Sequence, residues 1–335
     1  MVDGYRIEPN SNLEGANLLG ANLLGANLHG ANLDRSNLHA ANLRGASLYG
    51  ASLHGADLSN AILIDANLID ANLEGANLQG ANLHGADLHG ANLHGANLSF
   101  STLEGADLSY ANLEETNLHY ANMRGVSLRR VNSADINPPI ANPTIANPKK
   151  TRPANANLSR TNLQYSKLQY ANLAGSDMTA SDLTASDLHG ADLHGANLKN
   201  ANLQYSNLHG ADLRGSDLQG ADLHGADLHG ANLHEADLHD SNLSRANLSR
   251  ANLSRADLTA TNLTAANLHA ANLTATNLTN ADLTAARLTI AYLADVNLTC
   301  ANLTAADMTG ADLHDSNMTN TNLKNTLMPD GTKHE

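Results

Sequence analysis

The sequence predicts an all-β solenoid, a chain wound into coils with four short sides, and two regularities support this prediction. Leucine, or occasionally methionine, recurs every fifth residue from Leu13 to Leu323 except in one segment between Leu128 and Leu158, and no insertion shifts this phase. The residue two places before each of these centre residues is small, usually Ala, and the residue directly before the centre is usually Asn or Asp. The two residues after the centre vary freely.

A period of five excludes the simplest secondary structures. In an α-helix successive leucines would rotate by about 140° around the axis. In a straight strand they would alternate between two faces. A chain that turns a corner every five residues keeps all leucines inside, and four units close one coil. Asn and Asp suit such turns because their side chains hydrogen-bond to nearby backbone. We call the Asn or Asp site the strand position, and the two variable sites the first and second turn positions.

The composition fits a narrow repeated core. The 335 residues include no Trp and one Phe, so the large, varied side chains of a compact domain are missing. A formal charge of −14 argues against direct nucleic-acid binding. One cysteine, Cys300, excludes an internal disulfide framework. The sequence shows neither a secretory signal nor an apolar run long enough to insert into a membrane, so we expect a soluble, cytoplasmic protein.

The repeat resembles that of the pentapeptide-repeat family. Runs such as GANLLGANLLGANLHGANL (15–33) and GADLHGADLHGANLHEADL (220–238) match the A(N/D)LXX pattern of this family, and the match extends over nearly the whole chain. The resemblance implies a right-handed quadrilateral parallel β-helix with backbone ladders between coils. The final residues, TLMPDGTKHE, resemble terminal segments of cyanobacterial members.

One segment interrupts the leucine pattern. From 131 to 157 the chain is rich in proline and basic residues, and Pro138, Pro143, Pro148 and Pro153 stand where leucine is expected. Proline removes a backbone donor, so this segment is either a loosened coil or an excursion from the rod. The predicted organisation is therefore an N-terminal cap (1–12), a first β-helix (13–130), the interruption (131–157), a second β-helix (158–325) and a C-terminal cap and tail (326–335).

Candidate chemistry in the repeats is weak. Sixteen of the 17 histidines occupy first turn positions. In a four-sided coil, the successive residues His224, His229, His234 and His239 would face four directions. A column needs a spacing of 20, as in His189, His209 and His229. The imidazoles of a straight column converge poorly on a single metal ion. Because the rod offers no cleft and no catalytic motif occurs, we expect no enzymatic activity, no metal and no cofactor.

Basic residues around the interruption are the main candidate contact site. If a 20-residue register continues through the segment, Tyr110, Arg130, Lys150 and Tyr170 would stack in one column. Stacked like charges favour an anionic partner, and flanking tyrosines support protein contacts. The alternative is a solvated basic segment that discourages edge pairing. The possible partner-binding residues are Tyr110, Arg124, Arg129, Arg130, Lys149, Lys150, Arg152 and Tyr170.

Three functions are consistent with such a rod. The first is a non-catalytic scaffold that binds an unidentified protein partner. The second is a structural spacer or surface component of a larger assembly. The third follows from the resemblance, since some pentapeptide-repeat proteins mimic DNA and protect gyrase. This chain differs from those members, because its one Phe, Phe100, lies at a turn position and its charge of −14 is far below the roughly 44 phosphates of a 75 Å DNA segment. The oligomeric state is left open.

Overall fold

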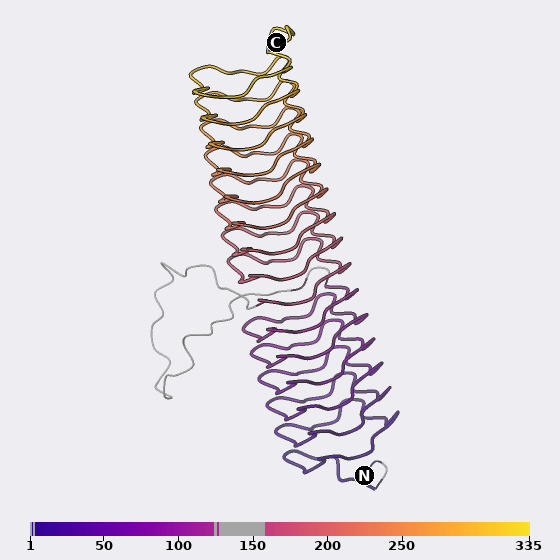
Figure 1. The fold of residues 1–335 in the computed structure, drawn as a ribbon. Helices are drawn as coiled ribbons and strands as arrows, with labels where there is room; N and C mark the ends of the chain where they lie inside the picture. The colour runs from indigo at the N-terminus through magenta and orange to yellow at the C-terminus, as the bar shows by residue number, and fades with distance from the viewer. Residues whose placement is uncertain (1, 3, 124–125, 127–157) are drawn as a thin grey trace, which may run out of the picture.

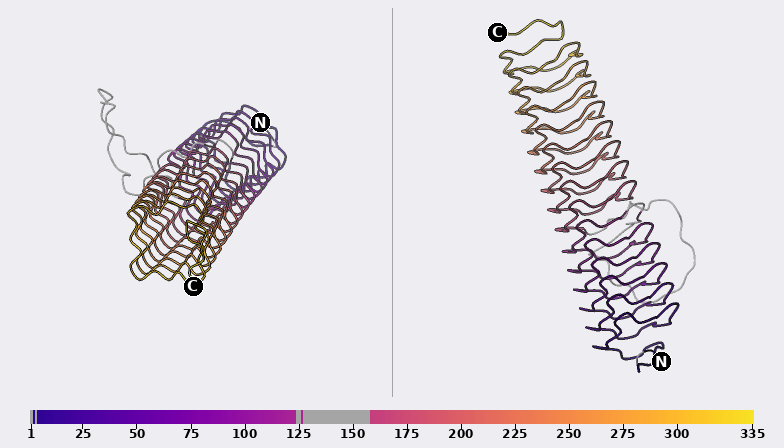
Figure 2. Two further views of the ribbon diagram at one scale, coloured as in Figure 1. Left: turned by 90° about the horizontal axis from the view of Figure 1, so that it is seen from above. Right: turned by 90° about the vertical axis from the view of Figure 1, so that its right-hand side faces the viewer.

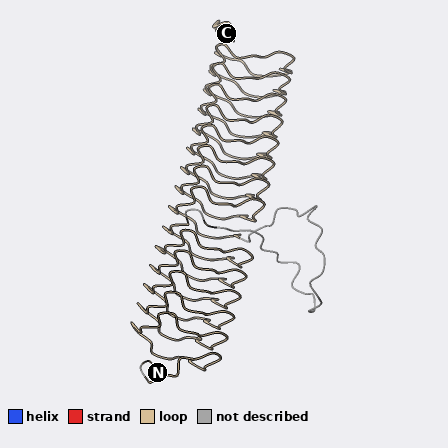
Figure 3. Cartoon of the chain, turned by 180° about the vertical axis from the view of Figure 1, so that it is seen from behind, coloured by secondary structure: helices blue, strands red, loops and turns tan. Residues whose placement is uncertain are grey.

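The computed structural model describes residues 2, 4–123, 126 and 158–335, which form one long rod with the two ends of the chain at opposite ends (Figures 1 and 2). The described residues contain no helix and no extended strand, and Figure 3 draws them entirely as loops and turns. Their regular structure consists of single-residue parallel bridges between residues 20 apart, such as Asn12 with Asn32 and Asn17 with Asn37. Four bridge columns follow, one on each side of the coil. We number them first to fourth from Asn12, Asn17, Asn22 and Asn27.

Each repeat forms backbone hydrogen bonds both within its own turn and to the next coil. In the repeat centred on Leu33, the Leu33 N–H donates to the Ser52 carbonyl at 2.7 Å. The Arg35 N–H donates to the His54 carbonyl at 2.9 Å. The Ser36 N–H closes the turn on the Leu33 carbonyl at 3.1 Å. A five-residue unit thus satisfies its backbone polar groups without any long strand.

The strand-position side chains form a second hydrogen-bond ladder. Asn32 Oδ1 accepts from the backbone N–H of Asp34 at 3.0 Å, which caps its own turn. Between coils, Asn117 Nδ2 donates to Asn97 Oδ1 at 3.1 Å. The same two contacts recur along the rod, so the preference for Asn and Asp arises from turn chemistry, as the sequence predicts.

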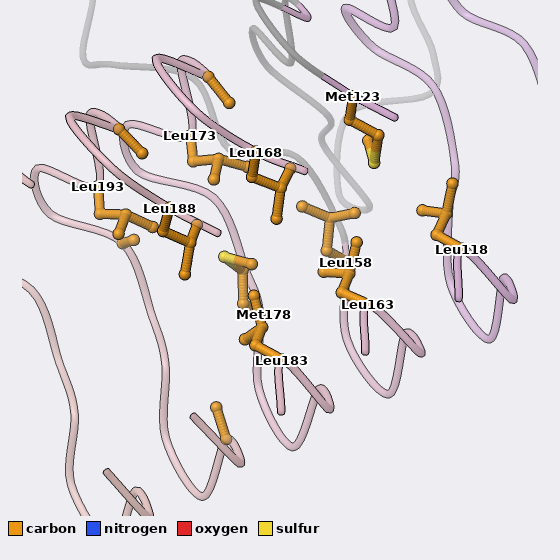
Figure 4. Packing of buried hydrophobic residues seen from close by; sticks show 14 of the residues in the cluster. Leu118, Met123, Leu158, Leu163, Leu168, Leu173, Met178, Leu183, Leu188 and Leu193 are labelled. Atoms are coloured by element: carbon orange, nitrogen blue, oxygen red, sulfur yellow. The ribbon is translucent and has the colours of Figure 1, made fainter. Parts of the chain in front are cut away.

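The core is a single file of leucine and small side chains along the axis. The centre leucines inside the rod, such as Leu48 and Leu228, are 0% exposed, and the Ala side chains before them are buried as well. Figure 4 shows side chains from successive sides of the coil, including Leu163 and Leu168, directed into the interior. Each buried leucine contributes about 1.5–3 kcal/mol, so stability depends on the number of stacked coils. The predicted inward direction of the leucines is confirmed.

The second turn residue has a left-handed backbone. Glycine at this position has φ near 60°, and so do non-glycine residues such as Arg250 at 59°. At some corners a large second turn residue is followed, one coil later, by a glycine at the same position. The large side chain then packs against that glycine. A Cβ on Gly190 would lie 2.8 Å from the ring of Tyr170, and a Cβ on Gly225 would lie 2.8 Å from the ring of Tyr205. These two glycines therefore provide space as well as conformational freedom.

The bridge spacing changes at the interruption. Asn117 bridges Asn162 and Asn122 bridges Lys167, so 45 residues separate partners that are elsewhere 20 apart. The Leu118 N–H still donates to the Asn162 carbonyl at 2.7 Å, so the two halves of the rod are stacked on one another. The predicted interruption at 131–157 lies outside the described residues.

The changed spacing overturns the column predicted for Tyr110 and Tyr170. The 25 additional residues are not a multiple of the 20 in one coil, so every later residue moves by one side relative to an unbroken count. Tyr110 follows Asp107 of the fourth column, whereas Tyr170 follows Lys167 of the third column and lies against Gly190. The two tyrosines therefore occupy neighbouring corners of the rod.

Short segments fold against each end of the stack. Near the N-terminus, Val2 pairs antiparallel with Tyr5, and the Tyr5 hydroxyl accepts from the Asn17 N–H at 3.2 Å. Val2, Tyr5 and Ile7 pack against the hydrophobic core. Near the C-terminus, Leu327 pairs antiparallel with Lys333.

Candidate functional site

Only two of the eight predicted partner-binding residues can be placed. Arg124, Arg129, Arg130, Lys149, Lys150 and Arg152 lie outside the described residues. Tyr110 is 47% exposed and its ring lies 4.7 Å from that of His89. Tyr170 is 59% exposed and meets His189 edge-on, with ring centroids 5.4 Å apart. Both rings are accessible, but they do not form one surface column.

Three other aromatic residues form a column across the interruption. The rings of Phe100 and Tyr120 stack with centroids 5.2 Å apart and an interplanar angle of 15°. Tyr120 and Tyr165 stack at 4.9 Å and 13°. All three are second turn residues of the second column, and they are 56%, 48% and 46% exposed. We call these three residues the aromatic column.

His119 lies beside the aromatic column and contacts all three of its rings edge-on. The centroid of its imidazole lies 4.4 Å from Tyr120, 5.7 Å from Tyr165 and 6.0 Å from Phe100. Its Nδ1 is buried without a hydrogen-bond partner. Several other histidines, such as His39 and His224, contact a hydroxyl one coil later. His119 instead faces Gln164, whose amide donates to Asp182. The His119 ring therefore acts as a packing surface for the column.

An ion pair joins the two halves of the rod on the adjacent side. Arg160 Nη1 lies 3.1 Å from Glu115 Oε1, across the 45-residue step. His94 Nε2 is 3.8 Å from the other oxygen of Glu115. Both pairs are exposed, and exposed pairs contribute less than about 1 kcal/mol. Charge on this side is thus locally neutralised, whereas the aromatic column presents apolar surface.

Sequence reasoning did not predict the aromatic column. Phe100, Tyr120 and Tyr165 all stand at second turn positions, so a ring at each of these corners was visible in the sequence. An unbroken count of 20 places Tyr120 in register with residue 140 instead of Tyr165. The missing information was the length of the step, which only the bridge pattern supplies.

The predicted histidine column is present. His189 and His209 stack with centroids 5.1 Å apart, and His209 and His229 stack at 5.0 Å. Among the described residues, no group of three or more His, Cys, Asp or Glu side chains could hold one metal ion. The column is therefore a stack of separate imidazoles with no three-ligand centre.

The carboxylates serve as turn acceptors. Burial alone would raise the pKa of Asp57, but hydrogen bonds from the hydroxyl and N–H of Ser59 outweigh it, and the pKa is lowered. The hydrogen bond from the Arg214 guanidinium, together with its charge, lowers the pKa of Asp212. A carboxyl group with a lowered pKa stays ionised at neutral pH and makes a poor general acid.

Comparison with known proteins identifies the family. The sequence model for pentapeptide repeats matches overlapping stretches that together cover residues 10–63, 66–132 and 156–325. The chain belongs to the pentapeptide-repeat family. The fold of this family is a right-handed quadrilateral β-helix, in agreement with the four bridge columns. No curated protein matches the chain in sequence.

Solved pentapeptide-repeat structures resemble the chain to different extents. It is 28% identical to HetL of Nostoc sp. strain PCC 7120, a protein involved in heterocyst differentiation regulation, over 89% of this chain and 91% of HetL, with a TM-score of 0.28. It is 42% identical to Rfr23 of Cyanothece 51142 over 34% of this chain and 85% of Rfr23, with a TM-score of 0.26. It is 30% identical to a thylakoid-lumen protein of Arabidopsis thaliana over 32% of this chain and 66% of that protein, with a TM-score of 0.23. Scores this low support no argument about function.

In a pentapeptide-repeat protein the core positions belong to the repeat itself, so residues specific to one protein are expected on the surface. The matched family model is a structural repeat, and within the described ranges no helix has the length and apolarity needed to cross a bilayer. The centre and small positions are occupied by core residues throughout the stack. Variation among the repeats of this chain is therefore concentrated in the turn positions, where the aromatic column lies.

Proposed function

We propose that this pentapeptide-repeat protein is a non-catalytic scaffold that binds a protein partner through the aromatic column. The supporting observation is the exposure of three stacked rings at one corner of the rod. Phe100 is the single phenylalanine of the chain, and 56% of it is exposed to water. A large apolar ring on the surface is unfavourable unless another molecule covers it.

A purely structural role accounts for part of this arrangement. Stacking of Tyr120 on Tyr165 stabilises the joint between the two halves by about 0.5–1.5 kcal/mol. That role needs the ring faces, which are in contact with one another, and leaves free the ring edges that His119 does not contact. Aromatic residues with rigid, accessible rings dominate the energy of many protein interfaces. The edges of Phe100, Tyr120 and Tyr165 are thus the proposed contact surface.

The proposed chemistry of the partner follows from the charge of the segment that lies between Tyr120 and Tyr165 in the sequence. The neighbouring sequence contributes Arg129, Arg130, Lys149, Lys150 and Arg152, and these stay proposed contact residues together with Arg124, Tyr110 and Tyr170. A protein with an acidic surface beside an apolar patch would match rings and basic residues together. Neither nucleic-acid binding nor membrane insertion forms part of this proposal.

The test is co-purification from the native source with wild-type protein and two matched variants. In the first variant, Phe100, Tyr120 and Tyr165 are all replaced by Ser. In the second, Tyr292→Ser removes a ring of similar exposure (57%) near the other end of the rod. We expect a stoichiometric partner with the wild type and with Tyr292→Ser, and its loss from the triple variant. Retention of the partner by a folded triple variant would contradict the proposal.

The two other functions predict different results in the same experiment. A spacer would co-purify in a large assembly whether or not the aromatic column is intact. A gyrase-interacting protein would change the rate of DNA supercoiling by gyrase when added in excess. Neither function has a specific structural observation in its favour, so the scaffold is the preferred proposal.

A further inference from the structure

The corner of the rod that carries the aromatic column has further large side chains in its second half. Tyr205 is the second turn residue of the second column two coils after Tyr165, and it is 60% exposed. Arg245 holds the same position two coils after Tyr205. The small residues Ala185 and Gly225 stand at the coils between them. One corner therefore presents a line of protruding side chains that continues across both halves of the rod.

The backbone N–H groups along this corner are already used. The Tyr205 N–H donates to the His224 carbonyl at 3.0 Å, and the Gly225 N–H donates to the Ser244 carbonyl at 3.0 Å. The Arg245 N–H donates to the Thr264 carbonyl at 2.9 Å. An extended peptide that binds by adding a strand needs free donors as well as acceptors. A segment whose own backbone is already paired, such as an α-helix, fits this corner better.

The spacing of the protruding side chains also matches a helix. The stacked rings of Tyr120 and Tyr165, in successive coils, have centroids 4.9 Å apart. A helix in a coiled coil advances about 5.2 Å per turn, so one helix turn corresponds to one coil of the rod. Tyr165, Tyr205 and Arg245 recur at every second coil, about 9.6 Å apart, close to the length of about 10.5 Å of one heptad. An extended strand repeats about every 6.8 Å on one face and matches neither spacing.

Arg245 provides a charge for recognition. Within the part of the chain that the structure describes, Arg245 forms no ion pair and its guanidinium donates no hydrogen bond. By contrast, Arg255 in the same coil lies 3.6 Å from Glu235 Oε1. An acidic side chain of a partner would neutralise Arg245 beside the apolar rings.

We propose that this corner binds an amphipathic α-helix of the protein partner, which lies along the rod with one helix turn per coil. The inference rests on the proposed function, because the aromatic column forms the first part of the surface. Apolar side chains one heptad apart pack between Tyr165, Tyr205 and Arg245, and an acidic side chain pairs with Arg245. From Phe100 to Arg245 the corner spans six coil steps, or about 29 Å, the length of a helix of about 20 residues.

The test is binding of a synthetic helical peptide of about 20 residues to the full-length protein. The peptide has leucine at heptad spacing, glutamate on both flanks and a tryptophan at one end. Because the chain contains no Trp, fluorescence anisotropy of the peptide reports binding without a signal from the protein. We expect a one-to-one complex with the wild type. Arg245→Glu and Tyr205→Ser should each weaken binding by about tenfold or more, as the loss of a central arginine or aromatic contact does.

Matched controls lie on other corners of the rod. Arg250 has the same flanking sequence as Arg245, SRANLS, but it follows Asn247 of the third column. Arg250→Glu should therefore leave the affinity within about twofold, and so should Tyr292→Ser. A peptide with lysine in place of glutamate should bind about tenfold more weakly or less, because it repels Arg245.

Several outcomes would overturn the helix site. Absence of peptide binding by the wild type would do so, as would equal losses in Arg245→Glu and Arg250→Glu. Equal binding of a peptide whose helix is broken by central prolines would show that the corner does not recognise a helix. Circular dichroism of each variant separates these results from unfolding. If the native partner needs the aromatic column but is retained by Arg245→Glu and Tyr205→Ser, the scaffold function stands and the helix site is refuted.

Discussion

Two adjoining stretches of the rod form the same backbone from different turn residues. From Gly210 to Gly230 every second turn residue is glycine, with φ between 59° and 66°. From Glu235 to Ala305 none is glycine, yet φ stays between 51° and 59°. A left-handed conformation costs an L-residue about 1–2 kcal/mol, so the second stretch contains strain that the first lacks.

Threonine ladders accompany the strained stretch. Thr279 Oγ1 donates to Asn277 Oδ1 at 2.7 Å and accepts from Asn297 Nδ2 at 2.9 Å. Thr299 repeats the pattern one coil later. In the glycine stretch, the first turn residues are mainly histidine, with Arg214 and Gln219 between them. The comparison indicates that stacking dictates the turn angle, and that the sequence offsets its strain either with glycine or with side-chain hydrogen bonds.

The largest effect is expected where glycine provides space. Gly225→Val places a β-branched residue at φ 65° with its Cβ against the ring of Tyr205. We expect a loss of about 3 kcal/mol in local stability, measured by hydrogen exchange of amides in neighbouring repeats. Gly230→Val is the control, because nothing lies within 4 Å of its Cβ position, and it should cost about 1 kcal/mol less. Equal losses would show that Tyr205 does not restrict this corner.

The opposite change should relieve strain in the second stretch. Ala260, Ala265, Ala270 and Ala275 are four successive corners with φ of 55–57°. Replacing all four by Gly should stabilise these coils by about 2 kcal/mol, since the relief of about 1 kcal/mol per residue exceeds the added backbone entropy. The denaturant midpoint of unfolding measures the gain. Asn280→Gly is the control and should change little, because Asn tolerates this conformation. A destabilised fourfold variant would contradict the strain argument.

Most of the fold was predictable because each described repeat adopts the same local backbone conformation. The leucine period fixed the inward positions, and Asn or Asp fixed the turns, so columns such as His189–His209–His229 followed from counting by 20. Counting by 20 failed between Leu118 and Leu163, because composition alone does not reveal the sequence separation of the residues that pair there. The resulting offset of 45 residues is a property of backbone pairing.

The candidate site was predicted less well for the same reason. Tyr110 and Tyr170 were assigned to one column through an assumed register, and they lie on different corners. Phe100, Tyr120 and Tyr165 were recognisable as turn residues, but the stacking of Tyr120 on Tyr165 depends on the step between the halves.

A smaller effect is expected from removing one threonine hydroxyl from the threonine ladder. Thr279→Ala removes the 2.9 Å hydrogen bond that Asn297 Nδ2 donates to Thr279 Oγ1 and leaves this amide only the longer 3.4 Å contact with Asn277 Oδ1. The loss should destabilise the adjacent coils by about 1 kcal/mol. Thr274→Ala is a matched control, because within the described structure the Thr274 hydroxyl forms no hydrogen bond. Hydrogen exchange at Ala275 and Asn280 compares the two variants. If both variants lose equal stability, the ladder does not offset the strain of the non-glycine corners.

The smallest effect concerns charge in the glycine stretch. Arg214 Nη2 lies 2.6 Å from Asp212 Oδ2, and this hydrogen bond lowers the pKa of Asp212 below its ordinary value of 3.8. A carboxylate with a lowered pKa stabilises the folded state above the ordinary pKa, and the gain disappears as the pH falls through the folded pKa. Asp212→Asn keeps an oxygen for the Arg214 N–H but removes the charge. The wild type should therefore be slightly more stable than this variant at pH 6, and the difference should shrink as the pH falls below the ordinary pKa of 3.8. In an NMR titration, Arg214→Gln should raise the pKa of Asp212, and an unchanged pKa would show that the guanidinium is not its cause.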